Sequence, residues 1–333
     1  MKVPTPVTDP NRFLRVLDDP NIQLLVRLQD QLLHVSADFW RRRKALNIHL
    51  PITTSSISSP MGLGSDSSPV AIEMFGQHTY LADSMQFLLE YGCRIAPEGA
   101  WYLMPSFRGE EADKTHLNQF FHSEAEIRGS LKDVQKVVAD YILALSKAAL
   151  EEFSTEIAAA AGTLDHIESM IDIGSIPEMT LDQAVEHLGE ASPCVVHDPA
   201  GFRTITREGE HRLMNEISPI LWVTHFDQMS VPFYQADEPG TDKARNADLL
   251  FGMGEIVGAG ERHVDGEQTR KALAHRQVAE QDYDWYVRMK TERPLLTSGF
   301  GLGVERWLMW LLRHDDIRDL QLVPRLNGIA LAP

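Results

Sequence analysis

Two arginines stand at the ends of apolar segments, and each lies beside a carboxylate. Arg108 is found in "SFRGEE" and Arg306 in "GVERW", which leads into the apolar run "WLMWLL". A guanidinium group stays charged when buried and donates paired hydrogen bonds, which suits it to phosphate oxygens. The alternative is structural, because buried charges are usually paired. Arg306 would then pair with a carboxylate, and Arg108 with Glu110 or Glu126 inside a sheet.

A second candidate group is acidic and lies in "ADLLFGMGEIVGAGERH". If this hairpin turns at Phe251 and Gly252, Asp248 and Glu255 face each other across it. Opposed like charges are unfavourable unless a cation lies between them, and Mg²⁺ bound to nucleotide phosphates would supply one. Two solvent-exposed acids at a strand edge are the alternative. Arg262, farther along the same segment, offers a fixed cation for a substrate carboxylate or amide.

Polar residues also alternate in "HLNQFFHSEAEI". In a strand, alternate residues share one face. That face would carry Phe120, His122, Glu124 and Glu126. The pattern favours a site wall on which Phe120 stacks against a flat ring, although a solvent-facing strand would show it too. In "ADSMQFLLE", Ser84 and Gln86 could bind a small polar ligand or only their own backbone.

Three glycines alternate in "GFGLGVERW", at positions 299, 301 and 303. Their spacing differs from the G-x-G-x-x-G fingerprint of dinucleotide-binding folds, and no βαβ unit follows them. Glycine within a strand commonly marks the close approach of a ligand or another part of the chain. The segment is therefore expected to be a strand that a ligand or a neighbouring part of the chain approaches closely.

The remaining pattern predicts an α+β fold in which helices flank a mainly antiparallel sheet. Helices are expected at about 10–46, interrupted at Pro20, and at 131–161. A mixed and mostly helical insertion is expected at about 162–216, with Thr180 as a helix N-cap. Strands are expected in "AIEMFGQHTYLA", "WYLMPSFRG", "NQFFHSEAEIRG", "PILWVTHF", "VPFYQA", "ADLLF" and "EIVGAGERH", and helices at 267–292. No interdomain linker stands out, so residues 1–333 are interpreted as one domain.

Composition limits the classes of partner. The chain has 333 residues, 43% of them hydrophobic, and 31 Lys plus Arg against 48 Asp plus Glu, a net charge of −17. Such a surface repels nucleic acids and anionic membranes except at a local basic patch, of which residues 41–44 are the clearest example. Two distant cysteines argue against a disulfide framework or a zinc site. With no signal peptide and no long apolar stretch, a cytoplasmic protein is expected.

Several segments, in this order, resemble the catalytic domain of class II aminoacyl-tRNA synthetases of the aspartyl and asparaginyl branch. "SFRGEEADKTHLNQFFHSEAEI" is similar to the second motif of that branch, and "GFGLGVERWLMWLL" followed by "DDIRDLQLVPR" is similar to the third. The segments "GEHRLMNEISPILWVTHF", "PFYQA" and "DLLFGMGEIVGAGERH" also match in order. Several motifs in succession are far more specific than any one of them.

The resemblance implies a role for each candidate residue. Arg108 would hold the α-phosphate and the reacting carboxylate, and Arg306 the terminal phosphate of ATP. Phe120 would stack on adenine. The implied neighbours of the nucleotide are Glu110, His116, Gly301 and Gly303; those of Mg²⁺ are Asp248 and Glu255; those of the amino acid are Ser84, Gln86, Glu124 and Arg262.

Several features differ from the usual pattern of this synthetase branch, and they limit the activity that we expect of the chain. No anticodon-binding module is expected, and the chain resembles the archaeal asparagine synthetase related to these enzymes. Leu89 and Glu124 look asparaginyl-like, while Gln119 and the loop "SDSSPVA" depart from the usual residues. We expect a homodimeric ligase that converts aspartate or a related amino acid to an acyl-adenylate and transfers it to ammonia or a small amine. The alternatives are aminoacylation of tRNA or another carrier, and a catalytically silent paralogue.

Overall fold

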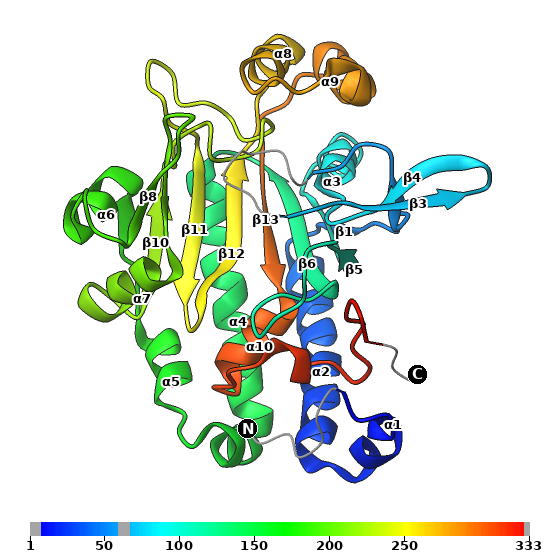
Figure 1. Cartoon of the computed structure of the whole chain (residues 1–333), viewed down its shortest axis with the longest axis vertical. Coiled ribbons are helices and arrows are strands. Elements are labelled where there is room, and N and C mark those ends of the chain that lie inside the picture. The colour runs from blue at the N-terminus through cyan, green and yellow to red at the C-terminus, as the bar shows by residue number, and fades with distance from the viewer. Residues whose placement is uncertain (1–7, 59–66, 330–333) are drawn as a thin grey trace.

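The computed structural model describes residues 8–58 and 67–329, and a central sheet organises this part of the chain (Figure 1). The eight strands of the sheet follow the order β1-β5-β6-β13-β12-β11-β10-β7. Pairing is antiparallel through the centre and parallel only at the two edges, between β1 and β5 and between β10 and β7. The predicted α+β class and mainly antiparallel sheet are therefore confirmed. In sheet order the strands are Leu46–Asn47, Ala100–Phe107, Gln119–Arg128, Thr297–Gly303, Gly254–Glu261, Asn246–Phe251, Ile220–Thr224 and Glu178–Thr180.

Two long helices, α2 (Pro20–Arg42) and α4 (Leu131–Ala161), cover one face of the sheet. Figure 1 shows α4 running behind the central strands. The expected helix at 10–46 is divided at Pro20, as predicted, because proline suits a first helical turn and Asp19 caps it by accepting from the backbone N–H of Asn21. The short helices α1 (Arg12–Arg15) and η1 (Val16–Asp18) precede it.

The insertion at 162–216 is less helical than predicted. It holds the helices α5 (Asp165–Asp172), α6 (Leu181–Leu188) and α7 (Arg207–Glu216), but also β7 and the pair β8 (Val195–His197) and β9 (Arg203–Ile205). Thr180 caps α6 through a reciprocal pair of hydrogen bonds with Gln183, as expected. Because β7 joins the central sheet, this segment extends the sheet.

Smaller elements surround the sheet. The hairpin of β3 (Val70–Met74) and β4 (Gln77–Leu81) forms around Gly76 as predicted and projects from the body in Figure 1. The short strand β2 (Thr53–Thr54) pairs with the end of β4. Helix α3 (Gln86–Gly92) follows it, and α8 (Gly266–His275), η2 (Glu280–Tyr283) and α9 (Asp284–Glu292) occupy the expected range 267–292. Helix α10 is Val304–Leu311 and η3 is Ile317–Asp319. No helix in the described ranges is both long and apolar enough to span a bilayer.

Two local predictions are wrong. "VPFYQA" forms no strand: a turn precedes it, Pro232 has no N–H for a ladder, and only Gln235 makes an isolated bridge, to Arg262. The composition of segment 50–70, rich in serine, glycine and proline, predicts a long loop, but the segment contains β2 at its start. Its residues 59–66 lie outside the described part of the chain, so the part of "SDSSPVA" that falls there is not described.

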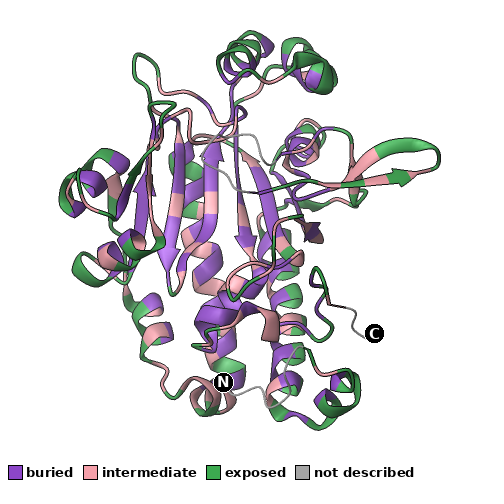
Figure 2. Cartoon of the chain, in the orientation of Figure 1, coloured by how far each residue is buried: buried purple, intermediate pink, exposed green. Residues whose placement is uncertain are grey.

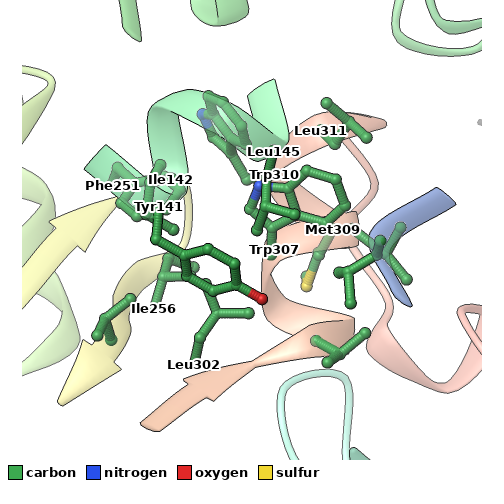
Figure 3. Close-up of a cluster of buried hydrophobic side chains, with 14 of the residues drawn as sticks. Tyr141, Ile142, Leu145, Phe251, Ile256, Leu302, Trp307, Met309, Trp310 and Leu311 are labelled. Atoms are coloured by element: carbon green, nitrogen blue, oxygen red, sulfur yellow. The ribbon is translucent and has the colours of Figure 1, made fainter. Parts of the chain in front are cut away.

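The core lies between the sheet and α2, α4 and α10. On β13, Phe300 and Leu302 belong to this core. Figure 3 shows Leu302 in the same cluster as Trp307 and Trp310 of α10. Figure 2 shows the central strands largely buried, whereas the β3–β4 hairpin is a mixture of intermediate and exposed residues. The opposite face of the sheet carries the candidate site.

Candidate active site

One row of directly paired residues crosses five strands on the face that the long helices leave open. The strand registers align Tyr102 with Glu124, Glu124 with Gly301, Gly301 with Gly258, and Gly258 with Asp248. Neighbouring strands lie about 4.8 Å apart, so the row is roughly 19 Å long. Two glycines in its middle leave a hollow between Glu124 on one side and Asp248 on the other.

The alternate glycines of β13 make room for carboxylates of β6. A Cβ atom at position 299 would lie 1.8 Å from Glu126 Oε2, and one at position 301 would lie 3.0 Å from Glu124 Oε1. Because no real Cβ tolerates the first distance, Gly299 is required by the close approach of Glu126. The predicted close approach is therefore observed, and the neighbour at Gly299 and Gly301 is an acidic side chain of the protein itself.

A β-bulge positions the two acids proposed as metal ligands. The prediction that Asp248 lies directly opposite Glu255 is wrong, because Asp248 pairs with Gly258 and Glu255 with Leu250. The register shifts between Leu249 and Leu250, and the bulge turns both Ile256 and Val257 into the core. This extra residue brings Glu255 and Gly258 to the same face, although strict alternation would separate them.

Both carboxylates consequently lie over Gly258. A Cβ atom at that position would be 3.0 Å from Glu255 Oε1 and 3.8 Å from Asp248 Oδ1. Burial, together with the charges of Glu255 and Glu210, raises the pKa of Asp248 well above its ordinary value. Among the described residues, no three His, Cys, Asp or Glu side chains form a protein cage for a metal. The pair instead fits Mg²⁺, which keeps most of its coordination for water and phosphate oxygens.

The two arginines are only partly satisfied by protein groups. Arg108 forms no ion pair with the described residues, its buried Nε has no hydrogen-bond partner there, and its guanidinium lies 5.4 Å from the centre of the Phe120 ring. The structural alternative for Arg108 therefore fails, since Glu126 pairs with Arg262. Arg306 donates to the carbonyl oxygen of Glu255 at 2.9 Å and lies 3.6 Å from its Oε2.

Burial lowers the pKa of Arg306, and the nearby charge of Arg108 adds to this effect, although Glu255 opposes it. Two cations that repel each other in a partly enclosed space favour an anion between them. At the same end of the cleft, Glu110 Oε2 accepts from the backbone N–H of Ser68 at 3.1 Å. His116 Nδ1 lies 3.1 Å from Asp113.

Arg262 is held firmly at the other end of the cleft. Only 3% of it is exposed, and its Nη2 lies 3.1 Å from Glu126 Oε2. Its Nη1 donates to Gln235 Oε1 at 2.9 Å and its Nη2 to Gln86 Oε1 at 3.4 Å. Glu126 thus balances the charge of Arg262, while the two amides fix its orientation.

Glu124 is surrounded by donors. Its Oε2 accepts from Ser84 Oγ at 2.6 Å and from the hydroxyl of Tyr102, and its Oε1 lies 3.2 Å from His122 Nδ1. Burial disfavours the charged form, but His122 and these hydrogen bonds outweigh it and hold the pKa of Glu124 below its ordinary value. Glu124 is therefore a carboxylate at neutral pH.

Two adjoining cavities, of about 110 and 460 Å³, form the cleft and share Arg108, Glu255 and Arg306 in their walls. The smaller cavity lies against Phe120 and the larger one against Arg262. All thirteen candidate residues named from the sequence line one or both: Ser84, Gln86, Arg108, Glu110, His116, Phe120, Glu124, Asp248, Glu255, Arg262, Gly301, Gly303 and Arg306.

The sequence did not reveal four further residues near these side chains: Asp83, Tyr102, Glu210 and Gln235. Glu210 lies on α7, and burial followed by the charge of Glu255 raises its pKa to about 7. Asp83 is buried and accepts from Ser58 Oγ at 2.7 Å. All four lie in segments quoted from the sequence, but only the fold brings these side chains to the cleft. The local signals were the adjacency of Asp83 to Ser84 and the positions of Glu210 and Gln235 in segments that match the synthetase branch.

The sequence profile of tRNA synthetases class II (D, K and N) matches residues 7–327. The chain belongs to the class II tRNA synthetase family. The predicted resemblance is thereby confirmed over almost the entire sequence.

Curated and solved members of this family are similar to the chain. An asparagine–tRNA ligase of Pyrococcus furiosus is 30% identical over 260 residues, which cover 76% of this chain and 58% of that enzyme. Asparaginyl-tRNA synthetase of Pyrococcus horikoshii, solved with asparaginyl-adenylate, superposes with a TM-score of 0.87 at 24% identity, covering 97% of this chain and 73% of that one. Aspartyl-tRNA synthetase of Entamoeba histolytica gives a TM-score of 0.77 at 18% identity, covering 100% of this chain and 64% of that one. These structures show that the class II synthetase fold is shared.

Proposed function

We propose that this class II synthetase relative is an ATP-dependent, AMP-forming ligase that activates the carboxylate of aspartate or a related amino acid as an acyl-adenylate. The observation that carries the proposal is the cleft in which Arg108 and Arg306 remain without full charge compensation. Two guanidinium groups that protein groups only partly satisfy, beside an acidic pair, are expensive to bury unless a polyanion and a cation bind there together. A magnesium-bound triphosphate satisfies both requirements.

The reaction needs no protein nucleophile. The substrate carboxylate attacks the α-phosphorus of ATP, a P–O bond to pyrophosphate breaks, and the acyl-adenylate forms. Arg108, which lines both cavities, would bind the α-phosphate and the attacking carboxylate, while Arg306 would bind the terminal phosphate. Phe120 would stack on the adenine ring, with Glu110 and His116 beside it. Positioning and charge stabilisation supply the catalysis.

Asp248 and Glu255 are proposed as the residues that hold Mg²⁺. When bound, the ion neutralises phosphate charge and polarises the phosphoryl oxygens. The acidic pair over Gly258 supports this assignment, because two oxygen ligands beside a hollow leave room for phosphate oxygens.

The amino acid would occupy the larger cavity, where Ser84, Gln86, Glu124 and Arg262 converge. Leu89, at the position where aspartate-specific relatives carry lysine, is 1% exposed and packs in the core. Among described groups at this end, Arg262 is therefore the main cation for a side-chain oxygen. The known complex of a structural relative with asparaginyl-adenylate supports a small acidic or amide-bearing amino acid.

Ammonia or a small amine is the proposed acyl acceptor, and the net charge of −17 supports it because a polyanionic acceptor would be repelled. The alternative is transfer to tRNA, and the names of the asparagine–tRNA ligases similar to this chain favour it. A homodimer is also proposed. The exposed apolar side chains of Phe13, Leu14 and Leu17 near the N-terminal helices support a covered surface there.

Amino-acid-dependent exchange of pyrophosphate into ATP tests the activation step. We expect exchange with one or a few members of a panel containing aspartate, asparagine and their analogues. The Asp248→Asn variant should lose most of this exchange and require more Mg²⁺ for what remains. Absence of exchange with every amino acid would refute the proposal and favour a silent paralogue.

Product analysis then separates the acceptors. The loaded enzyme is given ammonia, small amines or tRNA in separate reactions, and the products are identified by mass spectrometry. Free amide supports the proposed acceptor, whereas aminoacyl-tRNA without free amide would overturn it.

A further inference from the structure

Tyr102 is a buried residue behind the cleft wall. It lies on β5 directly opposite Glu124 on β6, is 2% exposed, and packs with Ala82, Met85 and Leu89. It does not line either cavity. Since these packing neighbours are apolar, phenylalanine would fill the space equally well, and the hydroxyl group requires a separate reason.

The hydrogen bonds of that hydroxyl have a fixed direction. The backbone N–H of Met85 donates to Tyr102 Oη at 2.8 Å, and an N–H cannot accept in return. The single proton of the phenol is therefore available for Glu124 Oε2. Burial and the charge of Glu124 raise the pKa of Tyr102 well above its ordinary value, so the proton stays on the phenol. The chain of donation runs from Met85 through Tyr102 to Glu124.

A second chain of donation runs in parallel. The backbone N–H of Gln86 donates to Ser84 Oγ at 3.2 Å, and Ser84 Oγ donates to the same Oε2 of Glu124 at 2.6 Å. Both chains begin in segment 84–86 and end on one oxygen. The other oxygen, Oε1, lies over Gly301 on the cleft side, where His122 Nδ1 is 3.2 Å away.

We infer that Tyr102 is a positioning residue for recognition of the amino acid, because its hydroxyl locks segment 84–86 to Glu124. This inference rests on the proposed function of the cleft. These hydrogen bonds hold Glu124 through its Oε2 atom and direct Oε1 toward the substrate. They also keep Gln86 at its observed distance from Arg262. Tyr102 itself touches no substrate atom and acts only through these groups.

Removal of the hydroxyl group alone tests the role. In Tyr102→Phe we expect the KM for the amino acid in pyrophosphate exchange to rise about tenfold, as for the loss of a hydrogen bond to a charged group. The KM for ATP should stay within twofold of its original value. An unchanged KM for the amino acid, or an equal rise for both substrates, would overturn the inference.

Tyr141→Phe is the matched control. Tyr141 is also fully buried and its hydroxyl also has two partners, Ser36 at 2.5 Å and Ser123 at 2.8 Å, but it lies on α4 behind the sheet (Figure 3). This variant loses a comparable buried hydroxyl without contact with the cleft. It should therefore change stability but not the KM for the amino acid. Equal effects of the two variants on that KM would show a merely structural role.

A second readout does not depend on activity. The carboxyl carbons of ¹³C-labelled glutamate report the titration of Glu124, which can be assigned with Glu124→Gln. Loss of a donor should raise the pKa of Glu124 in Tyr102→Phe but not in Tyr141→Phe, and an unchanged titration would refute the coupling. If the wild-type protein shows no exchange at all, the proposed function fails, and this titration still decides whether Tyr102 controls Glu124.

Discussion

The two faces of the central sheet are built from the same strands but differ in what they bury. On the face covered by α4, β12 and β13 present Val257, Phe300 and Leu302 to a continuous apolar core. On the open face, the alternate residues of the same strands include Gly258 and Gly301. The face covered by α4 contributes most of the buried apolar side chains. The open face provides the cleft and its charged side chains. Alternation along a strand therefore separates stability from binding within one element.

The open face contains buried charges that the covered face largely avoids. Glu124, Glu126 and Arg262 are each at most 5% exposed, and they are tolerated because they bind one another or neighbouring donors. The comparison predicts that substitutions on the two faces will have separable effects. Core substitutions should change the free energy of unfolding, and cleft substitutions should change activation kinetics.

The largest expected effect on stability belongs to the covered face. Leu302→Ala removes a fully buried side chain and should lower the free energy of unfolding by about 2–5 kcal/mol. Urea denaturation measures this loss, with Leu322→Ala, at a residue that is 43% exposed, as the control. At low temperature, the exchange activity per folded molecule should remain close to the original. A folded Leu302→Ala protein that is inactive would show that the two faces are not separable.

The converse test removes a cleft arginine. Arg306→Ala should lower the exchange rate by about 10²–10³-fold, mainly through ATP use, since a preorganised charged donor is lost. Stability should change little, because the contacts of Arg306 with the described residues are a carbonyl hydrogen bond and a 3.6 Å ion pair. Arg288→Ala on α9, whose ion-pair distance is 3.9 Å, is the control. Normal exchange kinetics in Arg306→Ala would remove this residue from the proposed site.

The smallest expected effect concerns His263, which follows the end of β12 and is buried where the chain leaves the sheet. Burial lowers the pKa of His263 to about 4, and its Nε2 lies 3.1 Å from the carbonyl oxygen of Phe233. Because the unfolded imidazole takes up its proton near pH 6.5, its contribution to stability is complete above that pH and is lost as the pH falls toward 4. The free energy of unfolding of His263→Gln should fall less steeply over this range. Parallel curves for the two proteins would contradict the assignment.

Much of the cleft could be predicted because its residues lie within local motifs. Arg108 directly follows β5, Phe120 and Glu124 lie on the adjacent strand β6, and alternation alone places the last two on the same face. The break at Pro20 and the cap at Thr180 were equally local, since each depends on one residue and its immediate neighbours. Features of this kind can be predicted from sequence because they do not depend on how distant parts of the chain pack.

The rest depends on long-range geometry. The bulge between Leu249 and Leu250 cannot be read from a plain hairpin pattern, and it changes which residue lies opposite Asp248. Glu210 approaches the cleft only because α7 packs beside β12, and a Cβ atom at Gly254 would lie 2.2 Å from its Oε2. Tyr102 looked like an ordinary apolar strand residue, because its polar role depends on a partner 22 positions away.

The bulge in the β11–β12 hairpin also bears on how this protein can change over generations. If the bulge were straightened with every residue kept, Ile256 would pair with Leu250 and the Glu255 carboxylate would rotate toward hydrocarbon. Every ligand would still be encoded, yet the pair would be broken. The hairpin should therefore tolerate loss of one residue between Glu255 and Gly258, because strict alternation then keeps both on the same face, but not a substitution that straightens the bulge at full length.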